Sequence, residues 1–310
     1  MSVVPLVVIV GPTASGKSAL AVALARLLAE DGHGAEIVNA DSMALYRGMD
    51  IGTAKPSQAE RGGVRHHLLD VLDVRETSTV AGFQAMARER IAALRARGVI
   101  PILVGGSSLY VRAVTDDFEF PGTDPRVRAR WEAELERLGP AGLHEVLAAT
   151  SPQAARAILP GNGRRIVRAL EVIELTGRYS PRLPEPRYLL ENVHQFGLEL
   201  DRDLMDERIA SRVHAMFDQG LVEEVRQLAA AGLREGATAS RALGYRQVLD
   251  LIDGRIDLDQ AIRATIDGTR RFARKQLGWF RRDPRISWLD ATAPGLPQTI
   301  AADLFPPDRS

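Results

Sequence analysis

Short apolar runs alternate with amphipathic segments through the first third of the chain. Residues 3–10 are mostly β-branched and predict a buried strand, and leucines at helical spacing in residues 18–29 predict the helix that follows it. The pattern continues with a strand at residues 36–40, a helix at 79–97 and a strand at 99–104. Strands separated by helices pair in parallel, so we expect an α/β fold with a parallel sheet flanked by helices.

The pattern changes at residue 120, where proline, arginine and helical spacing replace the strands. We expect three helices there, at residues 126–138, 141–149 and 164–175. We interpret residues 120–194 as an all-helical insertion domain within a catalytic core made of residues 1–119 and 195–310.

The remainder of the core is predicted to be mostly helical. A strand is expected at residues 194–200, followed by helices at 203–220, 221–231, 241–252 and 258–282 and a closing strand at 286–289. Residues 291–310 are rich in proline and alanine, and we expect this tail to be loose.

Composition narrows the kinds of chemistry open to the chain. Its 310 residues contain no cysteine, which excludes disulfides, thiolate nucleophiles and cysteine-based zinc sites, so a bound metal would have oxygen ligands. No apolar run approaches the ~20 residues that cross a bilayer, and the first ten residues lack the features of a signal peptide. We therefore expect a cytoplasmic monomer with no membrane association and no obligate protein partner.

Charge is balanced overall, with a formal net charge of zero, so a nucleic-acid surface would have to be a local patch. Nearly all basic residues are arginine, and the lysines are Lys17, Lys55 and Lys275. A retained lysine can mark a place that needs a compact ammonium group, although chance retention is the alternative for each.

The segment between the first strand and the first helix fits the phosphate-binding pattern G-x-x-x-x-G-K-[ST] in full. Its residues are Gly11, Pro12, Thr13, Ala14, Ser15, Gly16, Lys17 and Ser18. Backbone amides and the positive end of the helix dipole attract phosphate oxygens, Lys17 adds a charge, Thr13 a hydroxyl, and Ser18 can ligate Mg²⁺. The sequence therefore predicts a P-loop NTPase-like sheet that binds a diphosphate or triphosphate.

A carboxylate is expected opposite this loop. Typical P-loop ATPases carry an acid at the end of a buried strand, but the strand at residues 99–104 ends in Gly105, Gly106 and Ser107. Asp41 instead follows the strand at residues 36–40, and the carboxyl ends of parallel strands line the ligand crevice. We expect Asp41 to face the bound phosphates; a turn-capping role is the alternative.

Several segments together resemble the tRNA dimethylallyltransferase family. They are GPTASGKS at residues 11–18, DSMALYRGMDIGTAKP at 41–56, HLLD at 67–70, GGSSLY at 105–110, RALEV at 168–172, LGYRQ at 243–247 and TRRFARKQ at 269–276. The resemblance runs from residue 7 to about 290. It implies transfer of a dimethylallyl group from dimethylallyl diphosphate to the exocyclic N6 of the adenosine 3′ of the anticodon in tRNA.

The resemblance also implies roles for individual residues. Asp41 is similar to the family's general base, Ser107 stands near the target adenine, and Arg226 matches a diphosphate ligand. The residues expected to bind the anticodon stem-loop are Asp41, Ser42, Met43, Ala44, Ser107, Arg128, Arg164, Arg165, Arg168, Arg271 and Lys275. Mg²⁺ is the expected cofactor.

The sequence departs from the family pattern at three places. The segment before Arg164 usually reads Asn-Asp-Pro but is Gly161-Asn162-Gly163 here, which leaves the RNA contacts of the insertion open. Ser107 replaces a threonine and keeps its hydroxyl, while Ala44 stands where many members have glutamine.

Three other functions share parts of this pattern. A small-molecule kinase would use the same loop with ATP and an aspartate at the next strand end, and an isopentenyltransferase could act on free adenine nucleotides. A nucleic-acid-dependent ATPase is a more distant alternative. The helical insertion and the basic helix at residues 258–282 favour an RNA acceptor.

Overall fold

The computed structural model describes residues 3–117, 120–181 and 184–306 and divides the chain into two compact units. Met1–Asp117 and Tyr188–Ser310 form one unit, called the core unit below, and Phe118–Arg187 form the other, called the helical unit.

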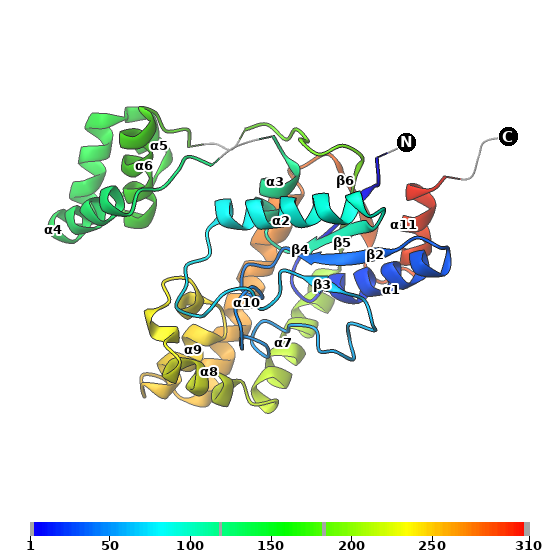
Figure 1. Ribbon diagram of the computed structural model, residues 1–310. Helices are drawn as coiled ribbons and strands as arrows, with labels where there is room; N and C mark the ends of the chain where they lie inside the picture. The colour runs from blue at the N-terminus through cyan, green and yellow to red at the C-terminus, as the bar shows by residue number, and fades with distance from the viewer. Residues whose placement is uncertain (1–2, 118–119, 182–183, 307–310) are drawn as a thin grey trace. The chain divides into compact units, whose positions relative to one another are not determined.

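The core unit is built on one sheet in which every neighbouring pair of strands is parallel (Figure 1). The strands are β1 (Leu6–Val10), β2 (Ala35–Asn39), β3 (His66–His67), β4 (Ile100–Gly105), β5 (Val193–Glu199) and β6 (Ile286–Asp290), in the order β3-β2-β4-β1-β5-β6. The predicted parallel α/β sheet is confirmed. The two-residue strand β3 is too short to leave a pattern in the sequence.

Helices cover both faces of the sheet, which explains why the central strands are apolar throughout. In β1, Leu6, Val8 and Val10 pack toward α2 (Val80–Ala96) and α3 (Ser108–Thr115). Val7 and Ile9 point the other way, toward α1 (Lys17–Glu30). Because successive side chains of a strand alternate between faces, a strand buried on both sides must be continuously apolar.

Helix α11 (Leu296–Leu304) contradicts the expectation that residues 291–310 are loose. Leu296, Ile300 and Leu304 recur every fourth residue and join the apolar cluster around α1. Helix α11 lies beside α1 (Figure 1). Residues four apart lie on one helical face, so this spacing gives the segment a stripe that it can bury. Pro297 is the second residue of the helix, in its first turn, where the backbone amide has no partner within the helix and its absence costs no hydrogen bond.

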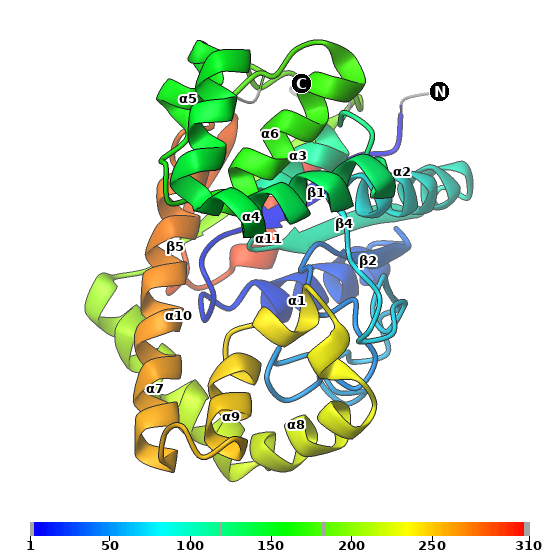
Figure 2. The same ribbon diagram turned by 90° about the vertical axis from the view of Figure 1, so that its left-hand side faces the viewer.

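Four further helices complete the core unit: α7 (Arg202–Asp218), α8 (Leu221–Ala230), α9 (Tyr245–Ile252) and α10 (Leu258–Phe280), with short 3₁₀ turns at Leu233–Glu235 and Ala239–Arg241. Helix α10 runs beside α7 (Figure 2) and shares an apolar cluster with it. Helices α8 and α9 form another cluster with Tyr46 and Met49 from the segment after β2. That long segment is therefore packed against helices from the far end of the chain.

The helical unit has a core of its own, around Leu143, Leu147, Ile166 and Leu170. It consists of α4 (Pro125–Thr150), α5 (Pro152–Ala157) and α6 (Gly163–Thr176). Helix α4 is interrupted at Gly139, whose φ of 69° is left-handed, so it corresponds to the two helices expected at residues 126–138 and 141–149. In the part of the chain that the structure describes, no helix has the length and apolar character needed to cross a membrane.

Candidate active site

The phosphate-binding pattern forms a tight loop between β1 and α1. Gly11 has a φ of +147° and Gly16 a φ of +89°, and a Cβ at Gly11 would lie 2.9 Å from the carbonyl oxygen of Leu198. Position 11 therefore requires glycine, because any other residue would have an unfavourable φ and a Cβ too close to the Leu198 carbonyl. Gly16 caps α1, which begins at Lys17, so the first amides of that helix and its positive dipole end are presented at the loop.

The ammonium group of Lys17 lies inside the loop. It donates a hydrogen bond to the carbonyl oxygen of Pro12 at 2.6 Å, and the Ser15 hydroxyl donates to the same oxygen at 2.9 Å. Burial, and after it the positive charge of Arg212, lower the pKa of Lys17 to about 8, and the negative charge of Asp41 opposes them. Lys17 is thus a cation whose charge depends on pH near neutrality.

A glutamine from α10 holds the loop from the other side. The Thr13 amide donates to the Gln276 side-chain oxygen at 2.9 Å, and the Gln276 side chain is buried. A Cβ at Gly106 would lie 2.2 Å from the Gln276 side-chain nitrogen, so the glycine after β4 makes room for this contact. Gln276 lies in a segment that carries the family resemblance, but sequence reasoning did not single it out as a site residue.

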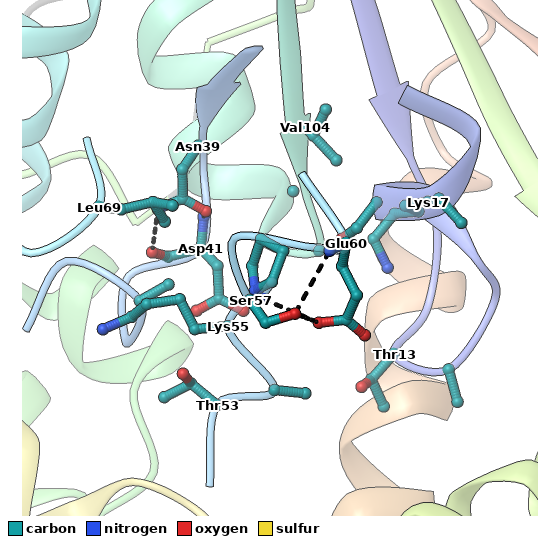
Figure 3. A pocket seen from close by; sticks show the side chains of 18 of the residues that line it. Thr13, Lys17, Asn39, Asp41, Thr53, Lys55, Ser57, Glu60, Leu69 and Val104 are labelled. Carbon is teal, nitrogen blue, oxygen red and sulfur yellow. Dashed lines mark hydrogen bonds between the residues drawn. The ribbon is translucent and has the colours of Figure 1, made fainter. Parts of the chain in front are cut away.

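Asp41 follows β2 in a turn held by Asn39. The Asn39 side chain accepts from the Asp41 amide at 3.0 Å and donates to the carbonyl oxygen of Leu68 at 3.0 Å. One carboxylate oxygen of Asp41 accepts from the Met43 amide at 2.8 Å, as in a turn cap. Asp41 is nevertheless exposed to the cavity, and Figure 3 shows it on one side with Lys17 and Thr13 on the other.

These groups line a cavity of about 1180 Å³ at the carboxyl edge of the sheet. Of the residues predicted from sequence, the lining includes Thr13, Ala14, Gly16, Lys17, Ser18, Asp41 and Ala44. Those outside the lining are Gly11, Pro12, Ser15, Ser42, Met43, Ser107, Arg226, Arg271 and Lys275, together with the predicted residues of the helical unit. The structure thus brings together the phosphate loop and the strand-end carboxylate.

Two arginines that sequence reasoning missed also line the cavity. Arg208 and Arg212 lie one turn apart on α7, so both can project from the same side of that helix. Burial lowers the pKa of Arg212, and the negative charges of Asp41 and Glu60 counteract this. Arg212 remains a cation and sits within reach of the charges of Lys17 and Asp41. In the sequence, the only indication that these arginines act together was their spacing of four residues within the predicted helix 203–220.

The segment after β2 is fixed by Lys55, one of the three lysines in the chain. Its ammonium group contacts the carboxylates of Asp50 and Asp70, each at 2.6 Å, and the carbonyl oxygen of Tyr46 at 2.9 Å. The Lys55 side chain is only 3% exposed, so all three hydrogens of the ammonium group find acceptors in a buried place. A compact ammonium suits this geometry better than a planar guanidinium.

The same segment is attached to α8 through Glu224. One carboxylate oxygen accepts from the amides of Asp50 (3.1 Å) and Ile51 (2.7 Å); the other accepts from the amide of Gly52 (3.3 Å) and the Tyr245 hydroxyl (2.6 Å). A Cβ at Gly52 would lie 2.4 Å from the Tyr245 ring. Glu224 therefore fastens the cavity wall to the helices by four hydrogen bonds.

Ser107 and Arg226 occupy positions at the margin of this arrangement. Ser107 directly follows β4 and Gly106 and is the N-terminal cap residue of α3. Arg226 is on the exposed side of α8, where its side chain is 60% exposed and pairs with Glu223 at 3.4 Å. The arginine whose charge acts on Lys17 is therefore Arg212, and Arg226 lies outside the cavity lining.

The basic residues expected to bind RNA fall into two groups. In the helical unit, Arg128 and Arg168 contact the buried carboxylate of Glu171, at 3.3 and 2.8 Å, and these contacts hold the unit together. Arg164 and Arg165 are exposed, and Arg165 donates to the carbonyl oxygen of Pro181 at 3.3 Å. On α10 of the core unit, Arg271 and Lys275 are exposed.

Metal ligands are sparse around the cavity. Within residues 3–117, 120–181 and 184–306, no group of three or more His, Asp or Glu side chains is arranged to hold a metal ion. Ser18, at the N-terminus of α1, lines the cavity and offers a hydroxyl oxygen. One hydroxyl beside a phosphate site fits Mg²⁺, which is commonly held by one or two protein ligands, water and substrate phosphates.

The fold and the site define a P-loop protein in which a glycine-rich loop, two arginines of α7 and a strand-end carboxylate line one cavity. The family model described as IPP transferase matches residues 44–283, and the chain belongs to this family.

Curated relatives support the assignment over nearly full length. The chain is 64% identical over 290 residues to the tRNA dimethylallyltransferase of Kineococcus radiotolerans, covering 93% of this chain and 91% of that protein. It is 60% identical over 285 residues to the tRNA dimethylallyltransferase of Streptomyces coelicolor, covering 92% and 89%.

Solved structures agree with this assignment. The full-length tRNA isopentenylpyrophosphate transferase of Bacillus halodurans matches with a TM-score of 0.70 and 38% identity, covering 97% of this chain and 96% of that chain. A eukaryotic dimethylallyltransferase solved acting on tRNA matches with a TM-score of 0.79 over 96% of this chain and 77% of that chain; at 24% identity it shows a shared fold.

Proposed function

We propose that this protein is a tRNA dimethylallyltransferase. It transfers a dimethylallyl group from dimethylallyl diphosphate to the exocyclic N6 of the adenosine 3′ of the anticodon, giving N6-isopentenyladenosine and diphosphate. Family membership and the names of close relatives support this reaction. The structural observation that carries it is the carboxylate of Asp41 in one cavity with Lys17 and Arg212.

The leaving diphosphate is assigned to the phosphate loop. An allylic diphosphate ionises readily because its cation is delocalised, so the protein has mainly to stabilise the developing negative charge and to place the acceptor in line. The amides at the start of α1, Lys17 and Arg212 converge on this place and can do so. When bound through Ser18, Mg²⁺ would neutralise further diphosphate charge. Arg226, predicted from the family resemblance, would have to reach the ligand from outside the cavity lining.

Asp41 is assigned the acceptor side of the reaction. The N6 lone pair of adenine is delocalised into the ring, so removing a proton as the new C–N bond forms assists the attack. Asp41 is exposed in the cavity, and its orientation is fixed by Asn39 and by the Met43 amide. Ser107 follows the neighbouring strand β4, from which its hydroxyl could contact the base.

Binding of tRNA is assigned to residues around the cavity mouth and on the helical unit. The target base must leave its stack to reach Asp41, at a cost that contacts elsewhere must offset. Ser42, Met43 and Ala44 adjoin Asp41, and the exposed cations are Arg271 and Lys275 on α10 and Arg164 and Arg165 on α6. Arg128 and Arg168 hold Glu171, so we expect them to support the insertion as well as any RNA contact. A cytoplasmic location and a monomeric state stay predictions.

One assay separates this function from its alternatives. Radiolabelled dimethylallyl diphosphate or γ-labelled ATP is supplied with unmodified tRNA or with AMP, and product is followed for each of the four pairs. Label in tRNA with the prenyl donor alone is the expected result. Transfer from ATP would identify a kinase, and label in AMP would identify an adenine-nucleotide isopentenyltransferase.

A further inference from the structure

Phe272 has an unusual position for a large apolar side chain. It lies on α10, lines the cavity, and is 45% exposed. Among the cavity-lining residues of the described chain, it is the one with a phenyl, phenol or indole ring. Exposed phenylalanine costs solvation free energy, and an aromatic side chain in a polar cavity indicates an apolar or planar ligand.

The position of Phe272 relative to the phosphate loop is fixed by α10. Gln276, one turn further along this helix, accepts from the Thr13 amide at 2.9 Å and packs at Gly106. Residues four apart lie on the same helical face, with a rise of about 6 Å between them. Phe272 therefore lies one helical turn before the residue that holds the loop, and its side chain lines the same cavity as the loop.

We propose that Phe272 is the surface on which the target adenine stacks after it leaves the RNA. The inference rests on the proposed function and adds the residue that receives the base. An extruded purine loses its stacking neighbours, and an aromatic ring restores that contact without reading sequence. Asp41 lines the same cavity as Phe272, so a base stacked there has its N6 within the space that holds both the carboxylate and the phosphate loop.

The first test is kinetic and uses the full-length protein. We expect Phe272→Leu to lower kcat/KM for tRNA about tenfold or more, the loss expected when base–aromatic stacking is removed. The KM for dimethylallyl diphosphate should stay within about twofold of wild type, and Phe272→Tyr should retain most activity because the ring is kept. The matched control is Phe305→Leu, which removes a ring that is 40% exposed and outside the cavity lining.

The second test observes the base directly. A tRNA anticodon stem-loop carrying 2-aminopurine at the target position is not a substrate, because this base lacks the N6 amine, and its emission is quenched by stacking. At saturation, we expect weaker emission with wild type and Phe305→Leu than with Phe272→Leu. Unfolding midpoints of all variants in urea are compared, and we expect them to agree because both rings are partly exposed.

Two outcomes would overturn the proposal. Equal emission from wild type and Phe272→Leu would show that the base stacks elsewhere. A raised KM for dimethylallyl diphosphate with unchanged kcat/KM for tRNA would place the ring against the prenyl group. Failure of the proposed function itself would appear as no transfer by the wild-type protein, which is a different result.

Discussion

At the scale of single residues, the assignment of Asp41 as general base gives a direct prediction for its substitution. We expect Asp41→Ala to lower kcat by about 10²-fold or more, because a positioned base contributes on the order of 10²–10⁴-fold to proton transfer. Affinity for tRNA should change little. Single-turnover transfer of labelled prenyl group measures the rate, and filter binding measures affinity for tRNA. Wild-type turnover by this variant would contradict the assignment.

Lys17 predicts how diphosphate binding depends on pH. The protonated ammonium attracts the anion, and its pKa in the free protein is lowered to about 8. The contribution of Lys17 to the affinity for inorganic pyrophosphate should therefore be complete well below pH 8, be reduced by half-titration near pH 8, and fall above it by up to about tenfold per pH unit for one proton. Calorimetry between pH 6.5 and 9.5 measures this.

The control for this titration is Lys17→Arg. Its guanidinium stays charged throughout the range, so any change in its affinity with pH reports the titration of pyrophosphate and of groups other than residue 17. The difference between the two curves belongs to Lys17. Parallel curves for the two proteins would contradict the lowered pKa.

Residues of the site differ in how far the sequence alone could reveal them. Lys17, Ser18 and Asp41 were predictable because a contiguous loop and the end of an adjacent strand fix their places. Arg212, Gln276 and Glu224 come from distant helices, and their roles depend on how α7, α8 and α10 pack, which helical periodicity does not specify. The clearest difference concerns the second cation, since Arg212 lines the cavity and Arg226 does not.

At the scale of elements, residues 50–52 of the segment after β2 are hydrogen-bonded to Glu224 of α8. We expect Glu224→Gln to destabilise the protein by about 1–3 kcal/mol, because the carboxylate accepts four hydrogen bonds and an amide nitrogen cannot accept any. Glu223→Gln is the matched control on the same helix: its side chain is 59% exposed, so its effect should be below about 0.5 kcal/mol. Urea unfolding measures both, and equal effects would mean that Glu224 does not fasten this segment.

Elements with strong periodicity were predictable, and those defined by tertiary contacts were not. The sheet strands other than β3, together with α1, α2 and α10, follow their apolar patterns closely. Helix α11 was missed because the proline and alanine content of residues 291–310 outweighed the two residues that it buries, Ile300 and Leu304. Strand β3 is two residues long and exists through its pairing with β2, so local sequence carries no signal for it.

At the scale of the whole molecule, the residues of the core unit just before and just after the helical unit lie side by side. Asp116 and Tyr188 form an antiparallel bridge, and Arg285 binds both oxygens of Asp116, at 2.9 and 3.1 Å. The Arg285 guanidinium also lies 4.1 Å from the centre of the Tyr188 ring, and Asp116 is 1% exposed. The core unit thus closes on itself at the place where the insertion begins and ends.

This closure predicts that the helical unit can be removed without loss of the diphosphate site. All residues lining the cavity belong to the core unit, and bridged antiparallel partners have Cα atoms about 5 Å apart, so a short Gly-Ser linker can replace Phe118–Arg187. We expect the shortened protein to bind inorganic pyrophosphate within about threefold of wild type, because the lining is unchanged.

Transfer to tRNA by the same shortened protein should fall about 10²-fold or more. This fall corresponds to a loss of about 3 kcal/mol in the free energy of tRNA binding, which the contacts of the insertion would otherwise supply. Arg164→Ala with Arg165→Ala in the full chain provides the graded control: it removes two exposed charges and should weaken tRNA binding mainly at low salt. Calorimetry and labelled transfer are measured on all three proteins. Full tRNA activity in the shortened protein would show that the insertion does not bind RNA, whereas loss of pyrophosphate binding would show that the core unit depends on it.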